Sequence, residues 1–264
     1  IKDNCFGVTD FNKLIQSVGY SDKSSDIKTS GMFGYGIYSF MAACERLEIT
    51  SKLSEEKESK YIFIDKKEFN KKNQDEVTFE PKNKKDFFEK SGTIICLSSF
   101  EKDSWNYINI KDLKSEVEKH FEIILTRKKL KIEIIWGNER RRCKPFDYKK
   151  YKGEVYDDYL HEINYETNKK KENPCTSKIK LDKPVHVYIK IVKENILNKE
   201  PIFVIKGRRI SEVKNIKSFK SKHKMDLRDH PNVTGFIELP KGDWLHPGRT
   251  DFKRTPQIRA LFNT

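Results

Sequence analysis

The stretch from Thr29 to Lys52, "TSGMFGYGIYSFMAACERLEITSK", constrains the fold of this chain more than any other. Three glycines lie within six residues and follow the pattern G-x-x-G-x-G: Gly31, Gly34 and Gly36. The apolar residues that follow recur at i, i+3, i+4 and i+7: Ile37, Phe40, Met41 and Cys44. This spacing predicts a helix over 35–45 with one apolar, buried face.

A glycine cluster that opens a helix lets backbone N–H groups approach an anion closely. The Walker A loop requires Lys and then Ser or Thr after its last glycine, where this chain has Ile37 and Tyr38. The dinucleotide loop has the reverse glycine order and directly follows a strand, whereas residues 19–30 are polar. Two interpretations stay open: a phosphate-binding loop of another type, or a helix start whose glycines permit tight packing.

The charge balance favours a polyanionic partner. Lys and Arg number 54 against 40 Asp and Glu, a formal net charge of +14, which suits DNA or RNA. The alternative is a chain whose many lysines are simply solvated. Cationic residues are dense in 206–228, and we predict that eight of them contact duplex DNA phosphates without reading bases: Lys206, Arg208, Arg209, Lys214, Lys217, Lys220, Lys222 and Lys224. A solvated loop is again the alternative.

The five cysteines are widely spaced and form no C-x-x-C pair, so the sequence indicates neither a zinc site nor a disulfide framework. A reducing setting fits, which predicts a cytoplasmic protein, or a nuclear one if eukaryotic. We see no apolar run of membrane-spanning length and no signal peptide, and we expect no membrane partner.

Patterning divides the chain into three regions: a folded region over 1–137, a linker or excursion over 138–183, and a second folded region over 184–264. The middle region is rich in Lys, Tyr and Asp and poor in aliphatic residues. Alternating strands are predicted in the other two, among them "GTIICLSSF", "VHVYIKIV", "PIFVIKG" and "VTGFIELP". The chain opens on what reads as a strand end, so we expect an upstream part that is absent here.

Two segments carry a family resemblance. "DNCFGV" and "SGMFGYGIYSFMAACERLEITSK" resemble the first and second glycine boxes of the GHKL ATPases, the superfamily of DNA gyrase, heat-shock chaperone ATPases, MutL and MORC proteins. "VIKGRRISEV" and "GFIELPKGDWLHPGRTDFKR" resemble the transducer domain of MutL. The closest patterns are those of MutL and MORC. The resemblance implies an α/β (α+β) fold: a Bergerat-type ATP-binding sandwich over 1–137 and a smaller βαβ transducer-like domain over 184–264.

The resemblance assigns roles around an adenine nucleotide. Asp3 matches the carboxylate that accepts from the adenine amino group; a carboxylate only accepts, so it discriminates against the guanine carbonyl. Gly7 matches a glycine beside the base, while Cys5 stands where the family usually has glycine, which leaves the local geometry open. "VGYSDKSSDIKTSG", residues 18–31, resembles the MORC and MutL form of the lid. Phosphate contacts are implied for Ser21 and Lys23 of the lid and for the glycines of the second box, Gly31, Gly34 and Gly36.

Catalytic assignments are fewer. Arg249 in "LHPGRTDFK" matches the MutL lysine that reaches the terminal phosphate, with Lys253 as the second choice. In the family, a helix before the first box supplies a Glu that activates water and an Asn that holds Mg²⁺. Neither can be assigned in this chain. The implied cofactors are ATP and Mg²⁺.

The resulting hypothesis is an ATPase module in which ATP closes the lid and drives homodimerisation of a clamp on duplex DNA. The resemblance leaves two alternatives: a chaperone-type ATPase with protein clients, and a nucleotide-binding module that does not hydrolyse ATP.

Overall fold

The computed structural model describes the chain in twelve segments: 1–16, 36–71, 79–85, 88–103, 108–127, 130–167, 175–195, 199–213, 230–240, 244–245, 252–253 and 255–263. They form a mixed α+β structure of three sheets and a few short helices. The described residues up to Ile108 make one compact unit and those from Asn109 make a second. This division differs from the predicted boundary after residue 137.

The first unit is built on a five-stranded sheet of order β1-β5-β2-β3-β4, with every neighbouring pair antiparallel. Its strands are β1 (Lys2–Asp3), β2 (Cys44–Lys52), β3 (Ser59–Asp65), β4 (Lys82–Lys84) and β5 (Gly92–Phe100). Its helices are α1 (Phe11–Gln16), the 3₁₀ helix η1 (Gly36–Ala42) and α2 (Lys66–Lys71).

The core of this unit lies on one face of the sheet. Alternate residues of the central strands are buried, including Leu47 and Ile49 of β2. Helix α1 adds Phe11 and Ile15 to the same cluster. The apolar face predicted for residues 35–45 packs into this core, although the backbone there is a 3₁₀ helix that ends before strand β2 begins.

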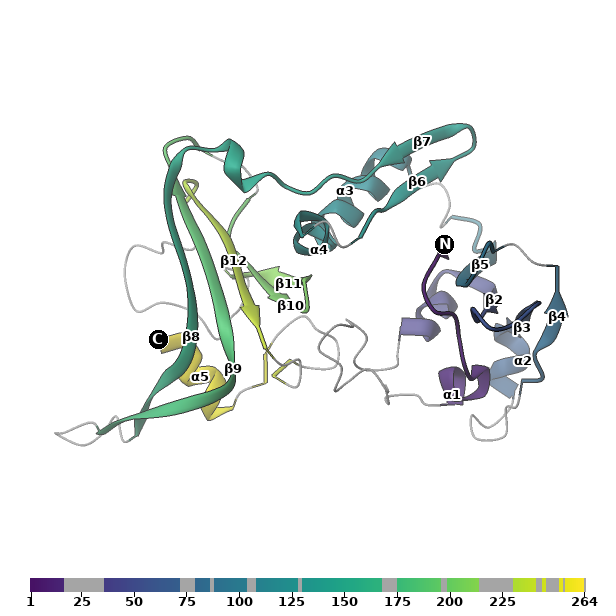
Figure 1. Ribbon diagram of the computed structural model, residues 1–264, viewed down its shortest axis with the longest axis horizontal. Helices are drawn as coiled ribbons and strands as arrows, with labels where there is room; N and C mark the ends of the chain where they lie inside the picture. The colour runs from purple at the N-terminus through teal and green to yellow at the C-terminus, as the bar shows by residue number, and fades with distance from the viewer. Residues whose placement is uncertain are drawn as a thin grey trace. The chain divides into compact units, whose positions relative to one another are not determined.

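The second unit contains a five-stranded sheet of order β11-β10-β12-β9-β8 (Figure 1). Its strands are β8 (Gly153–Thr167), β9 (Cys175–Val192), β10 (Ile202–Ile205), β11 (Arg208–Glu212) and β12 (Val233–Leu239). Strands β10 and β12 pair in parallel and the other pairs are antiparallel. Helix α5 (Pro256–Asn263) packs against β8.

Residues 153–167, which we expected within a linker or excursion, form the fifteen-residue strand β8. This strand lies at the end of the sheet, with Val155, Tyr156 and Tyr159 about half exposed. An edge strand needs few buried aliphatic residues, so the polar composition is compatible with a strand.

A small α/β group completes the second unit: helices α3 (Ile110–His120) and α4 (Glu122–Thr126), the antiparallel ribbon β6 (Glu133–Trp136) and β7 (Glu139–Arg142), and the 3₁₀ turn η3 (Tyr148–Lys150). Leu125, Ile134 and Cys143 form its core. Asn109 caps α3 by accepting a 2.9 Å hydrogen bond from Asp112 N. Among the described residues, no helix is long and apolar enough to cross a membrane.

Candidate functional site

Asp3 lies where the short strand β1 meets the start of β5, directly opposite Thr93. One carboxylate oxygen, Oδ1, accepts two backbone hydrogen bonds: from Cys5 N at 3.0 Å and from Thr93 N at 3.1 Å. These bonds fix the orientation of the carboxylate. Among the described residues none donates to Oδ2, and Asp3 is exposed, so this oxygen is available to a ligand.

Asp3 begins a row of polar side chains that crosses three strands. Thr93 pairs with Asp3 on one side and with Ser51 of β2 on the other. Paired residues project from the same face of a sheet. Ser51 follows Leu47 and Ile49 at two-residue spacing, so the row faces the same side of the sheet as the core.

Ser51 connects strand β2 to Val8 of the loop after β1 and to the start of β5. Its hydroxyl accepts from Val8 N at 2.8 Å and donates to Gly92 O at 2.9 Å. Its Oγ also lies 3.2 Å from Thr93 Oγ1. Since the single Ser51 proton is used on Gly92, the Thr93 hydroxyl donates to Ser51, and its oxygen remains an acceptor. The row therefore presents two acceptors, Asp3 Oδ2 and Thr93 Oγ1, which suits a ligand with an amino group.

Position 7 requires a glycine because the loop backbone passes very close to strand β2 there. It has φ +86°, and an added Cβ would lie 2.4 Å from Lys52 O and 3.1 Å from Ser51 Oγ. A side chain at this position would push the loop 4–8 away from β2 and break the Val8 hydrogen bond to Ser51. Cys5, by contrast, has no positive φ, so the backbone at this position does not require a glycine.

The structure brings together two of the predicted site residues, Asp3 and Gly7. Gly36 begins η1, and Lys253 is half-buried with its backbone N–H donating to Trp244 O at 2.8 Å. The remaining predicted nucleotide contacts lie outside the described residues: Ser21, Lys23, Gly31, Gly34 and Arg249. The sequence did not lead us to Ser51 or Thr93, although Thr93 is visible as a small polar residue at the start of "GTIICL".

Three of the predicted DNA-contacting residues are described, and each is at least partly buried: Lys206, Arg208 and Arg209. The Arg209 side chain is only 8% exposed and forms an ion pair with Glu212, so its charge is already compensated. Five others lie outside the described residues: Lys214, Lys217, Lys220, Lys222 and Lys224.

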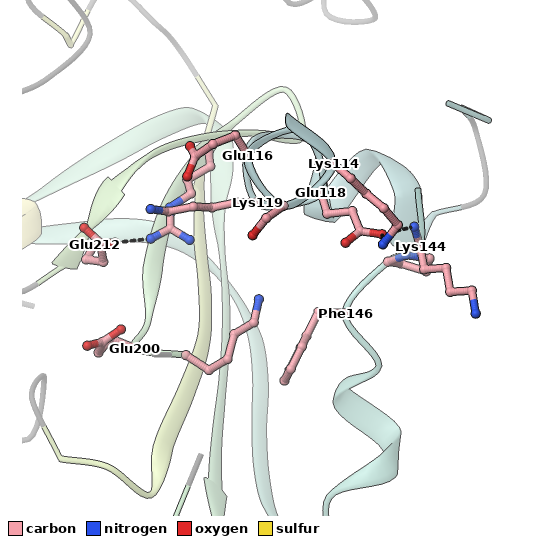
Figure 2. A pocket seen from close by; sticks show the side chains of 12 residues that line it. Lys114, Glu116, Glu118, Lys119, Lys144, Phe146, Glu200 and Glu212 are labelled. Atoms are coloured by element: carbon pink, nitrogen blue, oxygen red, sulfur yellow. Dashed lines mark hydrogen bonds and ion pairs between the residues drawn. The ribbon is translucent and has the colours of Figure 1, made fainter. Parts of the chain in front are cut away.

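The second unit contains a hollow of about 660 Å³ between α3, the segment after β7 and strand β11 (Figure 2). Its lining mixes both signs of charge around the Phe146 ring. Some of these charges are compensated within the lining itself: Lys114 pairs with Glu118 at 2.6 Å, and Arg209 pairs with Glu212. The hollow therefore shows no preference for an anion or a cation.

A buried carboxylate lies beside this hollow. Glu122 is 2% exposed, accepts from Tyr148 Oη, and forms a 2.8 Å ion pair with Lys199. The Lys199 ammonium also lies 4.1 Å from the centre of the Phe146 ring. Burial, followed by the negative charge of Glu122, raises the pKa of Tyr148 well above its usual value. These contacts hold α4 against the sheet, and we assign them a structural role.

Comparison with protein-family models and with curated protein sequences finds no match to this chain.

Proposed function

We propose that this chain is an ATP-binding module of the GHKL type, in which the first unit is the Bergerat-type nucleotide-binding layer and the second is the transducer-like domain. The observation that carries the proposal is the row Asp3–Thr93–Ser51 beside Gly7. An anchored carboxylate with one free oxygen, next to a hydroxyl acceptor, complements the two N–H bonds of the adenine amino group.

The glycine at the edge of this row supports the same conclusion. Gly7 allows the backbone to approach β2 closely, which keeps Val8 N within hydrogen-bond distance of Ser51 in this row. Among the described residues no group of three His, Cys, Asp or Glu side chains is arranged to hold a metal ion, so the proposal assigns no residue to Mg²⁺.

The wider proposal is that ATP closes the lid and brings two copies together as a clamp on duplex DNA. A ligand shifts such an equilibrium only by binding one state more tightly, which an ATP phosphate contacted from both lid and transducer would do. This part rests on the sequence, since Arg249, Lys214 and the other lysines assigned to it lie outside the described residues.

Isothermal titration with ATP and GTP tests the nucleotide proposal through Asp3→Asn. The asparagine Oδ1 can keep both backbone hydrogen bonds, but its amide places a donor where Oδ2 was an acceptor. Losing a hydrogen bond to a charged group costs about 1.5–3 kcal/mol. ATP affinity should therefore fall about 10- to 100-fold, and the parent should prefer ATP over GTP.

Asp65→Asn is the matched control. Asp65 ends β3 in the same unit, and its Oδ1 also accepts from backbone groups, Lys67 N at 3.0 Å and Glu68 N at 3.4 Å. This variant should bind ATP like the parent. Equal affinity for ATP and GTP, unchanged by Asp3→Asn, would refute the assignment.

A further inference from the structure

A separate hollow of about 480 Å³ lies in the second unit, between the end of α4 and the β6–β7 ribbon. Its lining comes from three short stretches of chain: Leu125, Leu130, Lys131, Arg142, Cys143, Lys144 and Pro145. Its volume falls within the range of about 300–1,000 Å³ that is typical of small-molecule sites.

The floor of this hollow is apolar and fixed. Leu125 and Cys143 are each 4% exposed and belong to the core of the α3–α4–β6–β7 group. Burial raises the pKa of the Cys143 thiol, so this side chain is neutral at physiological pH. Leu130, which is partly exposed, and Pro145 extend the apolar surface toward solvent.

The rim carries three cations. In the backbone register of the ribbon, Glu133 of β6 lies opposite Arg142 of β7. The 2.9 Å hydrogen bond from Cys143 N to Ile132 O continues this register, which places Lys131 opposite Lys144. Lys131, Arg142 and Lys144 are all exposed, and within the described part of the chain none of their side chains forms an ion pair.

The other two arginines of the ribbon, unlike these three cations, do have acidic partners. Arg141 pairs with Glu139, and Arg140 lies 3.8 Å from Glu133. No described residue in the lining of the 480 Å³ hollow is acidic. The 660 Å³ hollow, by contrast, contains four glutamates. Lys144 lines both, and its side chain extends away from Phe146 (Figure 2).

We propose that the hollow beside β7 is a binding site for a small amphiphilic anion. The apolar body of the ligand rests on Leu125, Leu130 and Cys143. Its carboxylate or phosphate group lies at the rim, where Arg142 offers a forked donor and the lysines add positive charge. The apolar floor excludes simple inorganic anions, and the cationic rim disfavours uncharged apolar molecules.

Titration of the full chain with three probes tests the two halves of this recognition separately: octanoate, 1-octanol and acetate. Amide shifts in ¹⁵N–¹H spectra report the location, through Leu130, Cys143 and Lys144. Octanoate should shift these amides saturably, octanol should bind roughly tenfold more weakly, and acetate should give no saturable shift. Raising NaCl from about 20 to 500 mM should weaken octanoate but not octanol.

Two variants separate the charge from the apolar contact. Arg142→Gln should weaken octanoate roughly fivefold and leave octanol unchanged, because it removes one rim cation. Leu130→Ser should weaken both probes. Arg140→Gln is the matched control, since Arg140 is exposed on the same strand but does not line the hollow, and it should change neither. All three positions are exposed, so the amide spectra should otherwise match the parent.

The natural anion could be free or part of a lipid headgroup, and vesicle sedimentation distinguishes the two. Sedimentation with phosphatidylglycerol vesicles that Arg142→Gln weakens and Arg140→Gln does not would assign the site to a lipid, and octanoate binding without sedimentation would assign it to a free amphiphile. The proposal is overturned if octanoate and octanol bind equally well, if octanoate shifts map elsewhere, or if Arg140→Gln matches Arg142→Gln.

Discussion

The buried ion pair between Glu122 and Lys199 makes the sharpest stability prediction. Lys199→Met keeps the hydrocarbon stem beside Phe146 but removes the only cation that pairs with this carboxylate among the described residues. Removing one partner of a buried pair costs about 3–5 kcal/mol, because the other charge stays buried and uncompensated.

The exposure of the pair places the expected loss near the lower end of that range. The Glu122 side chain is 3% exposed, whereas that of Lys199 is 25% exposed, so water can reach the vacated position. We expect a loss of about 3 kcal/mol. For a unit of this size this corresponds to a decrease in Tm of roughly 6–12 °C.

Calorimetry of the full chain measures this loss, and a double variant identifies its cause. Lys199→Met combined with Glu122→Gln should recover most of the stability, because the buried group is then neutral and can still accept from Tyr148 Oη. Lys111→Met, an exposed lysine at the start of α3, should stay within about 0.5 kcal/mol of the parent. The reasoning fails if Lys199→Met behaves like Lys111→Met, or if Glu122→Gln rescues nothing.

Three further predictions concern other positions. Gly7→Ala should destabilise the first unit by about 2–3 kcal/mol in thermal unfolding, because φ is +86° and the methyl group would clash with Lys52 O. Gly137→Ala is the control: φ is +59° but the space around it is open, so this variant should cost only about 1 kcal/mol. The folded-state pKa of Tyr148 is raised, so the stability that this phenol contributes is complete below pH 10 and is lost as the pH rises above that value. The free energy of unfolding measured in urea should therefore fall less steeply with pH for Tyr148→Phe than for the parent. Iodoacetamide should alkylate the exposed Cys5 and Cys96 quickly and the buried Cys44 and Cys143 slowly, as peptide mass spectrometry would show; equal rates would contradict the burial of the latter two.

Local patterns in the sequence were sufficient to predict several of the strands. Strands β5, β10 and β12 lie within the segments expected from alternation, and the helical spacing around Phe40 correctly identified a buried face. The helix itself is shorter than predicted and has 3₁₀ geometry. Its last predicted turn is lost because Cys44 starts β2, whose pairing with both β3 and β5 uses the backbone groups that a helix would need.

The pairing of strands that are far apart in the chain could not be predicted from the sequence. Nothing near Tyr156 or Asp157 indicates that they belong to a strand, since the partner strand β9 begins only at Cys175 and supplies most of the aliphatic residues. The same limit applies to the candidate site. Asp3 and Gly7 could be chosen by resemblance, but Ser51 and Thr93 join them only through the register of β1, β5 and β2.

The edge strand β8 also affects how copies of this chain meet one another. Its charged residues are all acidic, among them Glu154, Asp157, Asp158 and Glu162, and in the described part of the chain it pairs on one side only. Two such edges brought together would set carboxylates against carboxylates, so the strand resists edge-to-edge aggregation although its backbone is open. We therefore expect the variant in which Glu154, Asp157, Asp158 and Glu162 are all replaced by their amides to scatter light at neutral pH, at concentrations where solutions of the parent stay clear.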